Sequence, residues 1–264
     1  MNRLLFLVPL GALFVSNAAT AQSPFDGTWK ISLNNVAWSP KPDMFLLDKG
    51  MYTCKTCTPA YTIKADGSDQ AVTGHPYVDT IAIKVVNDHE VQETDKKGGK
   101  VVGTSTTTVS ADGKKAMWSF IDSSNTNGGP PVTGKGESTL VAKGPAGSHA
   151  VSGSWHIAKM ADMSDNGLIW SYKVTGNTIT MNSKSGQSYT AMLDGMDAPM
   201  KGDPGTTSVS VKMLGKNVME ETDKRDGKAI SVMTLTVAPD GKTAKAKVLD
   251  KLANRTTAFN IVKQ

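Results

Sequence analysis

The chain contains 264 residues and has a formal net charge of +5, with 29 Lys and Arg against 24 Asp and Glu. Aromatic residues make up 6% of it, and Arg occurs only at positions 3, 225 and 255. Because nucleic-acid platforms combine clustered basic side chains with stacking rings, we expect no nucleic-acid partner.

The first 21 residues have the pattern of a secretory signal peptide. Arg3 supplies a positive charge, residues 4–15 form an apolar run, and Ala19-Thr20-Ala21 has the small residues of a cleavage site. Cleavage near Ala21 predicts a protein of the periplasm or the cell exterior. The apolar run of about a dozen residues is shorter than the roughly 20 that span a bilayer, and no later run approaches that length, so we expect no transmembrane segment in the mature form.

Strand patterns follow this leader. Residues 27–33 alternate strictly, with Trp29, Ile31 and Leu33 on one face. Further strands are predicted at residues 44–47, 61–64, 80–86, 101–109, 116–121 and 138–141. Gly-Gly and Asp-Gly turns lie at 66–67, 98–99 and 112–113, and similar turns recur at 194–195, 226–227 and 240–241. Short strands joined by tight turns are typical of antiparallel meanders.

The segment 61–116 is repeated at 189–244 without a gap. The two copies are identical at 21 of 56 positions. A unit longer than the roughly 20 to 50 residues of a solenoid repeat indicates a duplicated domain. The sequence therefore predicts an all-β protein of two tandem antiparallel meander β-barrels with about eight to ten strands each. We place the first barrel at 25–143, a linker at 144–150 and the second barrel at 151–264; one barrel of some twenty strands is the alternative.

Both copies open with a Gly-x-Trp sequence, Gly27-Thr28-Trp29 and Gly153-Ser154-Trp155. This motif at the first strand of a meander resembles that of lipocalins and related fatty-acid-binding-type barrels, the calycins. The resemblance implies that Trp29 and Trp155 close one end of each barrel, under a cation from the last strand. Lys135 and Arg255 lie at the expected places. The whole chain also resembles a group of secreted bacterial proteins, a likeness that implies no particular activity.

One predicted strand of each copy is expected to supply the barrel interior. Its inward residues are Ala116, Trp118 and Phe120 in the first copy and Ala244, Ala246 and Val248 in the second. The second copy has much less side-chain volume at these positions. Either neighbouring side chains fill the gap or a ligand does, and we expect any cavity to lie in the second barrel rather than the first.

The two cysteines, Cys54 and Cys57, lie in a predicted hairpin turn. In an exported protein this spacing favours a local disulfide. The alternatives are a redox pair and a zinc site. A redox pair needs a helix start to lower the thiol pKa, and zinc needs two further ligands. The sequence offers neither, since its four histidines are dispersed.

Two acidic pairs, Glu93 with Asp95 and Glu221 with Asp223, each project from one strand face, as a catalytic carboxylate pair would. They stand beside a Lys-rich turn, and we expect them at the surface. Catalytic motifs such as Gly-x-Ser-x-Gly and His-Glu-x-x-His are absent from the sequence. We therefore expect no catalysis, no catalytic residues and no cofactor.

Met192 and Met196 correspond to Lys64 and Ser68 of the first copy, around an Asp-Gly turn, and are expected to be exposed. Thioethers bind copper(I), a soft ion, but adaptable packing is the commoner use of Met.

The sequence predicts a non-catalytic binding protein that carries or senses a small apolar ligand inside one barrel. The alternatives are a cell-envelope interaction or scaffold module with filled barrels, and a copper(I)-binding protein. The sequence identifies no particular protein partner.

Overall fold

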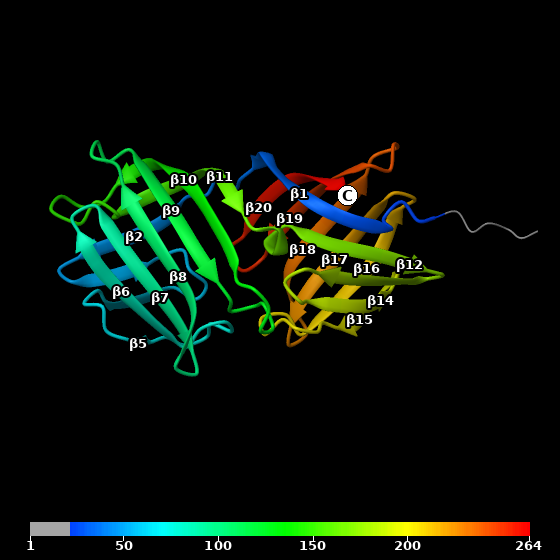
Figure 1. Ribbon diagram of the computed structural model, residues 1–264, viewed down its shortest axis with the longest axis horizontal. Helices are drawn as coiled ribbons and strands as arrows, with labels where there is room; N and C mark the ends of the chain where they lie inside the picture. Colours follow the sequence, from blue (N-terminus) through cyan, green and yellow to red (C-terminus); the bar gives the residue numbers. More distant parts are fainter. Residues whose placement is uncertain (1–21) are drawn as a thin grey trace, which may run out of the picture.

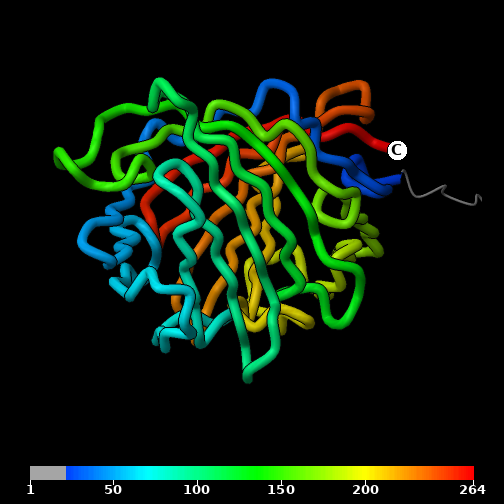
Figure 2. The backbone as a smooth tube through the Cα atoms, turned by 60° about the vertical axis from the view of Figure 1, so that its left-hand side comes forward, coloured from blue at the N-terminus to red at the C-terminus, as the bar shows by residue number. Residues whose placement is uncertain are grey.

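The computed structural model describes residues 22–264, and the predicted signal peptide at 1–21 lies outside them. Two ten-stranded antiparallel sheets, each curved into a nearly closed barrel, lie side by side along the long axis of the molecule (Figure 1). Figure 2 shows how strongly each sheet curves. The prediction of an all-β protein with two antiparallel barrels is confirmed. In the part of the chain that the structure describes, no helix has the length and apolar character needed to cross a membrane.

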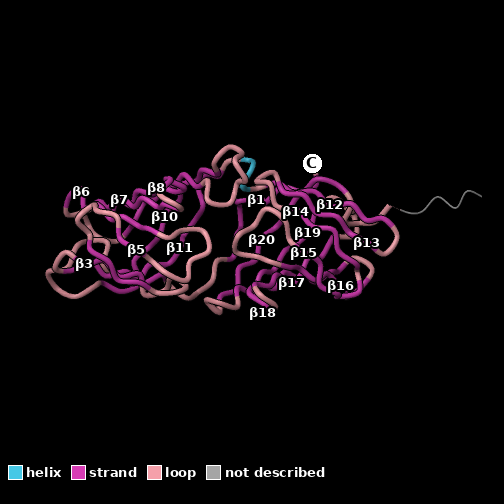
Figure 3. Tube along the Cα trace, turned by 90° about the horizontal axis from the view of Figure 1, so that it is seen from below, coloured by secondary structure: helices cyan, strands magenta, loops and turns pink. Residues whose placement is uncertain are grey.

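Each barrel is one continuous sheet. The first barrel contains, in spatial order, β4 (Tyr61–Lys64), β3 (Met51–Cys54), β2 (Asp43–Asp48), β11 (Gly153–Met163), β10 (Val132–Lys143), β9 (Lys115–Asp122), β8 (Lys100–Val109), β7 (Glu90–Lys97), β6 (Thr80–Asn87) and β5 (Gln70–Ala71). The second contains β14 (Ser188–Met192), β13 (Thr178–Ser183), β12 (Ile169–Thr175), β1 (Gly27–Ala37), β20 (Arg255–Lys263), β19 (Thr243–Asp250), β18 (Lys228–Val237), β17 (Val218–Arg225), β16 (Ser208–Gly215) and β15 (Asp194–Pro199). Between the barrels, η1 (Asp165–Gly167) forms a single 3₁₀ turn, cyan in Figure 3.

The two Gly-x-Trp strands are exchanged between the barrels. β1 lies in the second barrel, where it pairs with β12 and β20. β11 lies in the first barrel between β2 and β10. In Figure 1, β1 is the blue strand among the late strands of the chain. The division into blocks 25–143 and 151–264 is therefore wrong for these two strands.

The proposed linker also has a different role. Residues 144–150 join β10 to β11, which pair within one sheet, so this segment is a hairpin connection. The chain instead passes between barrels at 38–42 and at 164–168. The duplication explains why the local sequence could not reveal this exchange. Because the barrels are copies, each offers a Gly-x-Trp strand two equivalent neighbouring strands, and the side chains of the strand alternate in the same way in either barrel.

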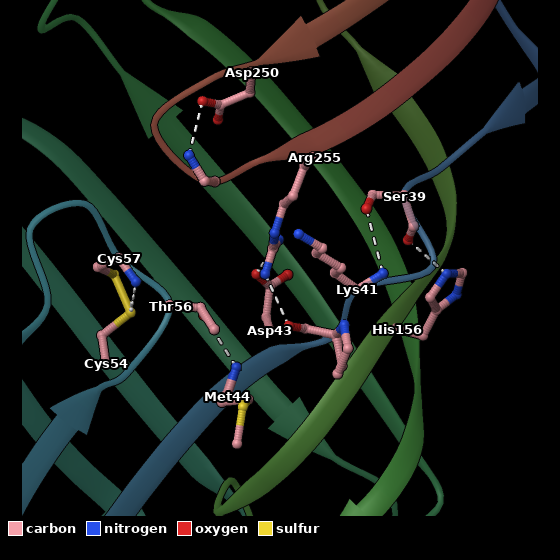
Figure 4. A network of polar contacts seen from close by, with 12 residues as sticks. Ser39, Lys41, Asp43, Met44, Cys54, Thr56, Cys57, His156, Asp250 and Arg255 are labelled. Atoms are coloured by element: carbon pink, nitrogen blue, oxygen red, sulfur yellow. Dashed lines mark hydrogen bonds and ion pairs between the residues drawn. A yellow bond between two sulfur atoms is a disulfide. The ribbon is translucent and has the colours of Figure 1, made fainter. Parts of the chain in front are cut away.

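Polar contacts hold the first crossing segment, between β1 and β2. The Arg255 guanidinium on β20 donates to Asp43 Oδ1 at 2.6 Å and to the Pro42 carbonyl at 2.8 Å (Figure 4). His156 Nε2 on β11 lies 2.8 Å from the Ser39 carbonyl. These contacts join the segment between β1 and β2 to a strand of each barrel, β11 of the first and β20 of the second.

Candidate ligand-binding site

The strand of the first copy that was predicted to line the interior is β9. Ala116 is buried, Trp118 and Phe120 are half-buried, and the alternate residues Met117, Ser119 and Ile121 are exposed. The period-2 pattern therefore assigned these side chains to the correct faces of the sheet.

The equivalent strand of the second copy, β19, alternates in the same way. Ala244 and Ala246 are buried and Val248 is half-buried, whereas Lys245 and Lys247 are exposed. The lysine side chains fix the outer face, because a lone ammonium is rarely buried.

A cavity of about 380 Å³ lies inside the first barrel. It is lined by Asp43, Phe45, Tyr52, Cys57, Tyr61, Glu93, Ser105, Thr107, Ala116, Trp118, Ser138, Val151, Trp155 and Ile157. Of the predicted interior residues, Ala116 and Trp118 line it. Phe120 stacks on Trp118, with ring centroids 6.3 Å apart, but faces a separate pocket beside Gln187 of the other barrel.

The cavity exists because small residues replace large ones. At the 128-residue offset of the repeat, Ser105 and Thr107 on β8 stand where Met233 and Leu235 stand on β18. Leu235 is fully buried in the second core, and Met233 packs against that core. The first barrel thus has hydroxyls where the second has apolar bulk.

Two more substitutions widen the hollow. Ser138 pairs across the sheet with Ala116, and Ile261 pairs with Ala244, so these two residues are structurally equivalent. Val151 likewise replaces Phe25: their backbone carbonyls accept the indole N–H of Trp155 and Trp29, respectively.

The interior rings of β9 have a counterpart on a different strand in the second barrel. Trp118 lies opposite Gly136 on β10, where an added Cβ would clash with the indole. In the second barrel Ala246 lies opposite Phe259 on β20, and Phe259 packs against the core. Phe259 therefore supplies the volume that β19 lacks.

The expectation of a cavity in the second barrel is consequently wrong. That interior is occupied by a continuous cluster of buried side chains. Its members are Phe25, Trp29, Tyr172, Ile179, Met181, Tyr189, Ala191, Val209, Val211, Met219, Leu235, Val237, Ala244, Ala246 and Ile261. Counting residues on one strand missed the contribution of its neighbours.

The acidic pairs point into the barrels, contrary to the prediction of a surface position. Glu93 lines the first cavity, and Glu221 is 7% exposed in the second core. On β7 the carboxylates share a face with buried Val91. That period-2 relation was visible in the sequence, but the neighbouring lysines of the turn obscured it.

Burial raises the pKa of Glu93 to about 8, and the nearby Asp95 charge adds to the effect. Burial also raises the pKa values of Tyr52 and Tyr61, with Glu93 contributing. One oxygen of Asp95, Oδ1, is buried without a hydrogen-bond partner. The cavity wall near β7 therefore holds a carboxyl group that is largely protonated at neutral pH.

In the second barrel the equivalent carboxyl group has donors. Tyr189 and Tyr172 donate to Glu221 Oε2 at 2.5 and 3.4 Å. Burial, reinforced by Asp223, nevertheless raises the pKa of Glu221 to about 8. The pKa of Asp223 rises to about 6, mainly through burial and then through the charge of Asp203.

The two motif tryptophans are buried at corresponding places in the two cores. Trp29 is fully buried in the second barrel and Trp155 is 3% exposed in the first. Lys263, on the last strand of the chain, lies over Trp29 with Nζ 4.8 Å from the ring centroid. A cation from the last strand thus covers one indole, as the calycin resemblance implies, although it is a different residue from the one predicted.

The two predicted cations lie elsewhere. Arg255 binds Asp43, and Lys135 is exposed on the outer face of β10. Cross-strand pairing explains the error. Val132 pairs with Asp122 and Arg255 with Asp250, so Arg255 corresponds to Val132 rather than to Lys135. Aligning the chain ends without the intervening hairpins shifted the match by three residues.

Cys54 and Cys57 form the predicted disulfide, with an S–S distance of 2.04 Å. Cys54 is buried in the first core, and Cys57 contributes to the cavity wall.

Met192 and Met196 are 44% and 67% exposed. The Met192 thioether lies 3.6 Å from the Thr178 hydroxyl, and copper(I) binding by the pair stays a prediction. Across residues 22–264, His, Cys, Asp and Glu form no group of three placed to hold a metal ion.

Comparison with known proteins adds no assignment. None of the family models scanned matches the chain, and no curated protein matches its sequence.

Proposed function

We propose that this is an exported, non-catalytic binding protein that carries or senses a small molecule in the first barrel, in the manner of a lipocalin-like carrier. The observation that carries the proposal is the contrast between two copies of one barrel. One copy is filled by its own side chains, and the other holds a cavity of about 380 Å³.

The cavity size supports a compact ligand. Sites for small molecules have volumes of roughly 300 to 1,000 Å³, and this one lies near the lower end. Burial of apolar ligand surface contributes about 25 cal/mol per Å², so about 200 Å² contributes roughly 5 kcal/mol. The lining modifies the expectation of a purely apolar ligand, because Ser105, Thr107 and Glu93 line the cavity together with the aromatic rings.

The second copy provides a direct test. Ser105→Met, Thr107→Leu and Ser138→Ile would give the first barrel the residues that fill the second. We expect native mass spectrometry of protein purified from its own cell envelope to detect a small molecule on the unaltered chain and none on this refilled variant. Met117→Ser, on the exposed face of β9, is the control and should retain the molecule.

Finding the molecule equally on the refilled variant would place it outside the cavity. That result would favour the alternative, an envelope interaction or scaffold module that uses the outer barrel surface. The second barrel already meets that alternative's expectation of a filled interior, whereas the first does not.

A further inference from the structure

In the described part of the chain, the first cavity is lined by carboxyl groups and by no basic side chain. Of the described residues that line it, Asp43 and Glu93 carry the only ionisable carboxyl groups, and none is Lys, Arg or His. Asp43 is already bound by Arg255 at 2.6 Å. Glu93 has only Asp95, another acid, as a neighbour with which to share a hydrogen bond. The cavity thus holds one carboxyl group with no cation to balance it.

The comparison with the second barrel shows what Glu93 lacks. Phe45 and Tyr172 are equivalent, because each pairs with the glycine of a Gly-x-Trp motif, Gly153 and Gly27 respectively. Tyr172 donates to Glu221, but a phenylalanine has no hydroxyl. The first barrel therefore lacks one hydroxyl donor that the second has beside its glutamate, and Phe45 and Glu93 both line the cavity there.

Aromatic rings surround this volume. Phe45 stacks on Tyr52 with centroids 6.1 Å apart, and Tyr52 lies 6.4 Å from Tyr61. The rings of Trp118 and Trp155 complete the aromatic lining. The faces of aromatic rings attract cations, and cages of such rings bind ammonium and quaternary ammonium groups.

We propose that the first-barrel cavity binds a small organic cation, an amine or quaternary ammonium on a compact apolar body, with its charged nitrogen beside Glu93 and its body among the aromatic rings. This inference rests on the proposed binding function and specifies its ligand class. An anion would lie beside the acidic groups of Glu93 and Asp95, with no basic side chain in the described cavity lining to bind it. A purely apolar ligand would leave the Glu93 carboxyl group with Asp95, another acid, as its one hydrogen-bond partner among the described residues.

Binding of a cation in this cavity should also release a proton from Glu93. A bound cation favours ionised Glu93, so its proton passes to the buffer and affinity for a permanently charged ligand rises between pH 6 and 8. The other ionisable groups around Glu93 are Asp95 on its own strand, Asp43, Tyr52 and Tyr61, with Asp122 next to Asp95 and His75 edge-on to Tyr61.

The test uses four probes of similar size: benzylammonium, benzyltrimethylammonium, benzyl alcohol and benzoate. Binding to the full mature chain is measured by isothermal titration calorimetry at pH 6 and 8 in buffers of different ionisation enthalpy. We expect both cations to bind at least tenfold more tightly than benzyl alcohol. Glu93→Gln should remove this preference and the proton release, while leaving affinity for benzyl alcohol unchanged.

Two controls separate the causes of a loss. Glu221→Gln makes the same change at the equivalent position of the filled barrel and should leave cation binding intact. The refilled variant should bind none of the probes. If benzyl alcohol or benzoate bound as tightly as the cations and the refilled variant lost them, the cavity would be a binding site but the cation inference would be overturned.

Failure of all four probes on the unaltered chain is resolved by native mass spectrometry. A co-purifying amine absent from the refilled variant supports the inference, and a neutral or anionic molecule overturns it alone. If both proteins carry nothing, the cation inference and the proposed function fall together.

Discussion

Trp29, near the start of the described residues, lies beneath the ammonium group of Lys263, near their end, with 4.8 Å between Nζ and the ring centroid. The contact exists because β1 crosses into the barrel built by the last nine strands of the chain. The second barrel therefore joins strands from both ends of the described chain, whereas the first is built from the consecutive strands β2 to β11.

The strand exchange predicts which fragments fold. Residues 38–163 contain all ten strands of the first barrel, β2 to β11, whereas residues 25–143 lack β11. We expect the fragment 38–163 to unfold cooperatively in urea when its unfolding is monitored by circular dichroism. The fragment 25–143 should be less stable, since only β1 could take the place of β11. Greater stability of 25–143 would mean that β1 fits β2 and β10 better than β11 does.

The cation over Trp29 should have a measurable effect on stability. Lys263→Met keeps most of the aliphatic stem and removes the charge, so we expect a loss of about 0.5–2 kcal/mol in the free energy of unfolding. Lys245→Met, on the exposed face of β19, is the matched control and should change little. Equal urea midpoints for the two variants would show that the contact between the Lys263 charge and the Trp29 ring does not stabilise the fold.

The cavity and its filled counterpart predict opposite effects of matched substitutions. Thr107→Leu adds an apolar side chain to the cavity wall and should raise the free energy of unfolding by about 1 kcal/mol. Leu235→Thr removes volume from a fully buried site and should lower it by roughly 2–4 kcal/mol. Guanidinium denaturation measures the free energy of unfolding of both variants. Destabilisation by Thr107→Leu would indicate that the cavity lacks room for the larger side chain.

The raised pKa of Glu221 predicts that the free energy of unfolding falls as the pH rises. Its pKa rises from an ordinary value near 4.5 to about 8 in the folded protein. The folded state therefore holds the proton more tightly, and this contribution is complete below pH 4.5 and is lost as the pH rises through 8. At about 1.4 kcal/mol per pKa unit, the loss is on the order of a few kcal/mol.

Glu221→Gln should remove the part of the decline that Glu221 contributes, because the amide cannot ionise, and should leave the part that comes from Glu93. We expect the variant to be more stable than the unaltered protein at pH 9 in urea denaturation. Glu220→Gln, which removes a carboxylate paired with Lys212 at 2.8 Å, is the control and should keep the decline. An unchanged pH profile in Glu221→Gln would show that Glu221 is ionised without penalty.

Several features of the site could be predicted from single strands. The inward direction of Ala116 and Trp118 followed from alternation alone, as did the outward direction of Lys245 and Lys247. The inward direction of Glu93 was accessible by the same rule, since Val91 lies two residues before it. The location of the cavity was not accessible, because it depends on how Ser105 and Ser138 combine across strands.

The sequence by itself determined the duplication, the strands, the disulfide and the two barrels, because these follow from local periodicity, turn residues and a cysteine spacing read within one copy. Only the tertiary structure decided which barrel β1 and β11 join, which cation covers Trp29 and which interior stays open. Duplicated strands have interchangeable hydrogen-bonding edges, so local pattern gives both placements the same pairing. The free volume of a barrel interior depends on side chains from many strands, so it is set only when the sheet has closed and those side chains pack together.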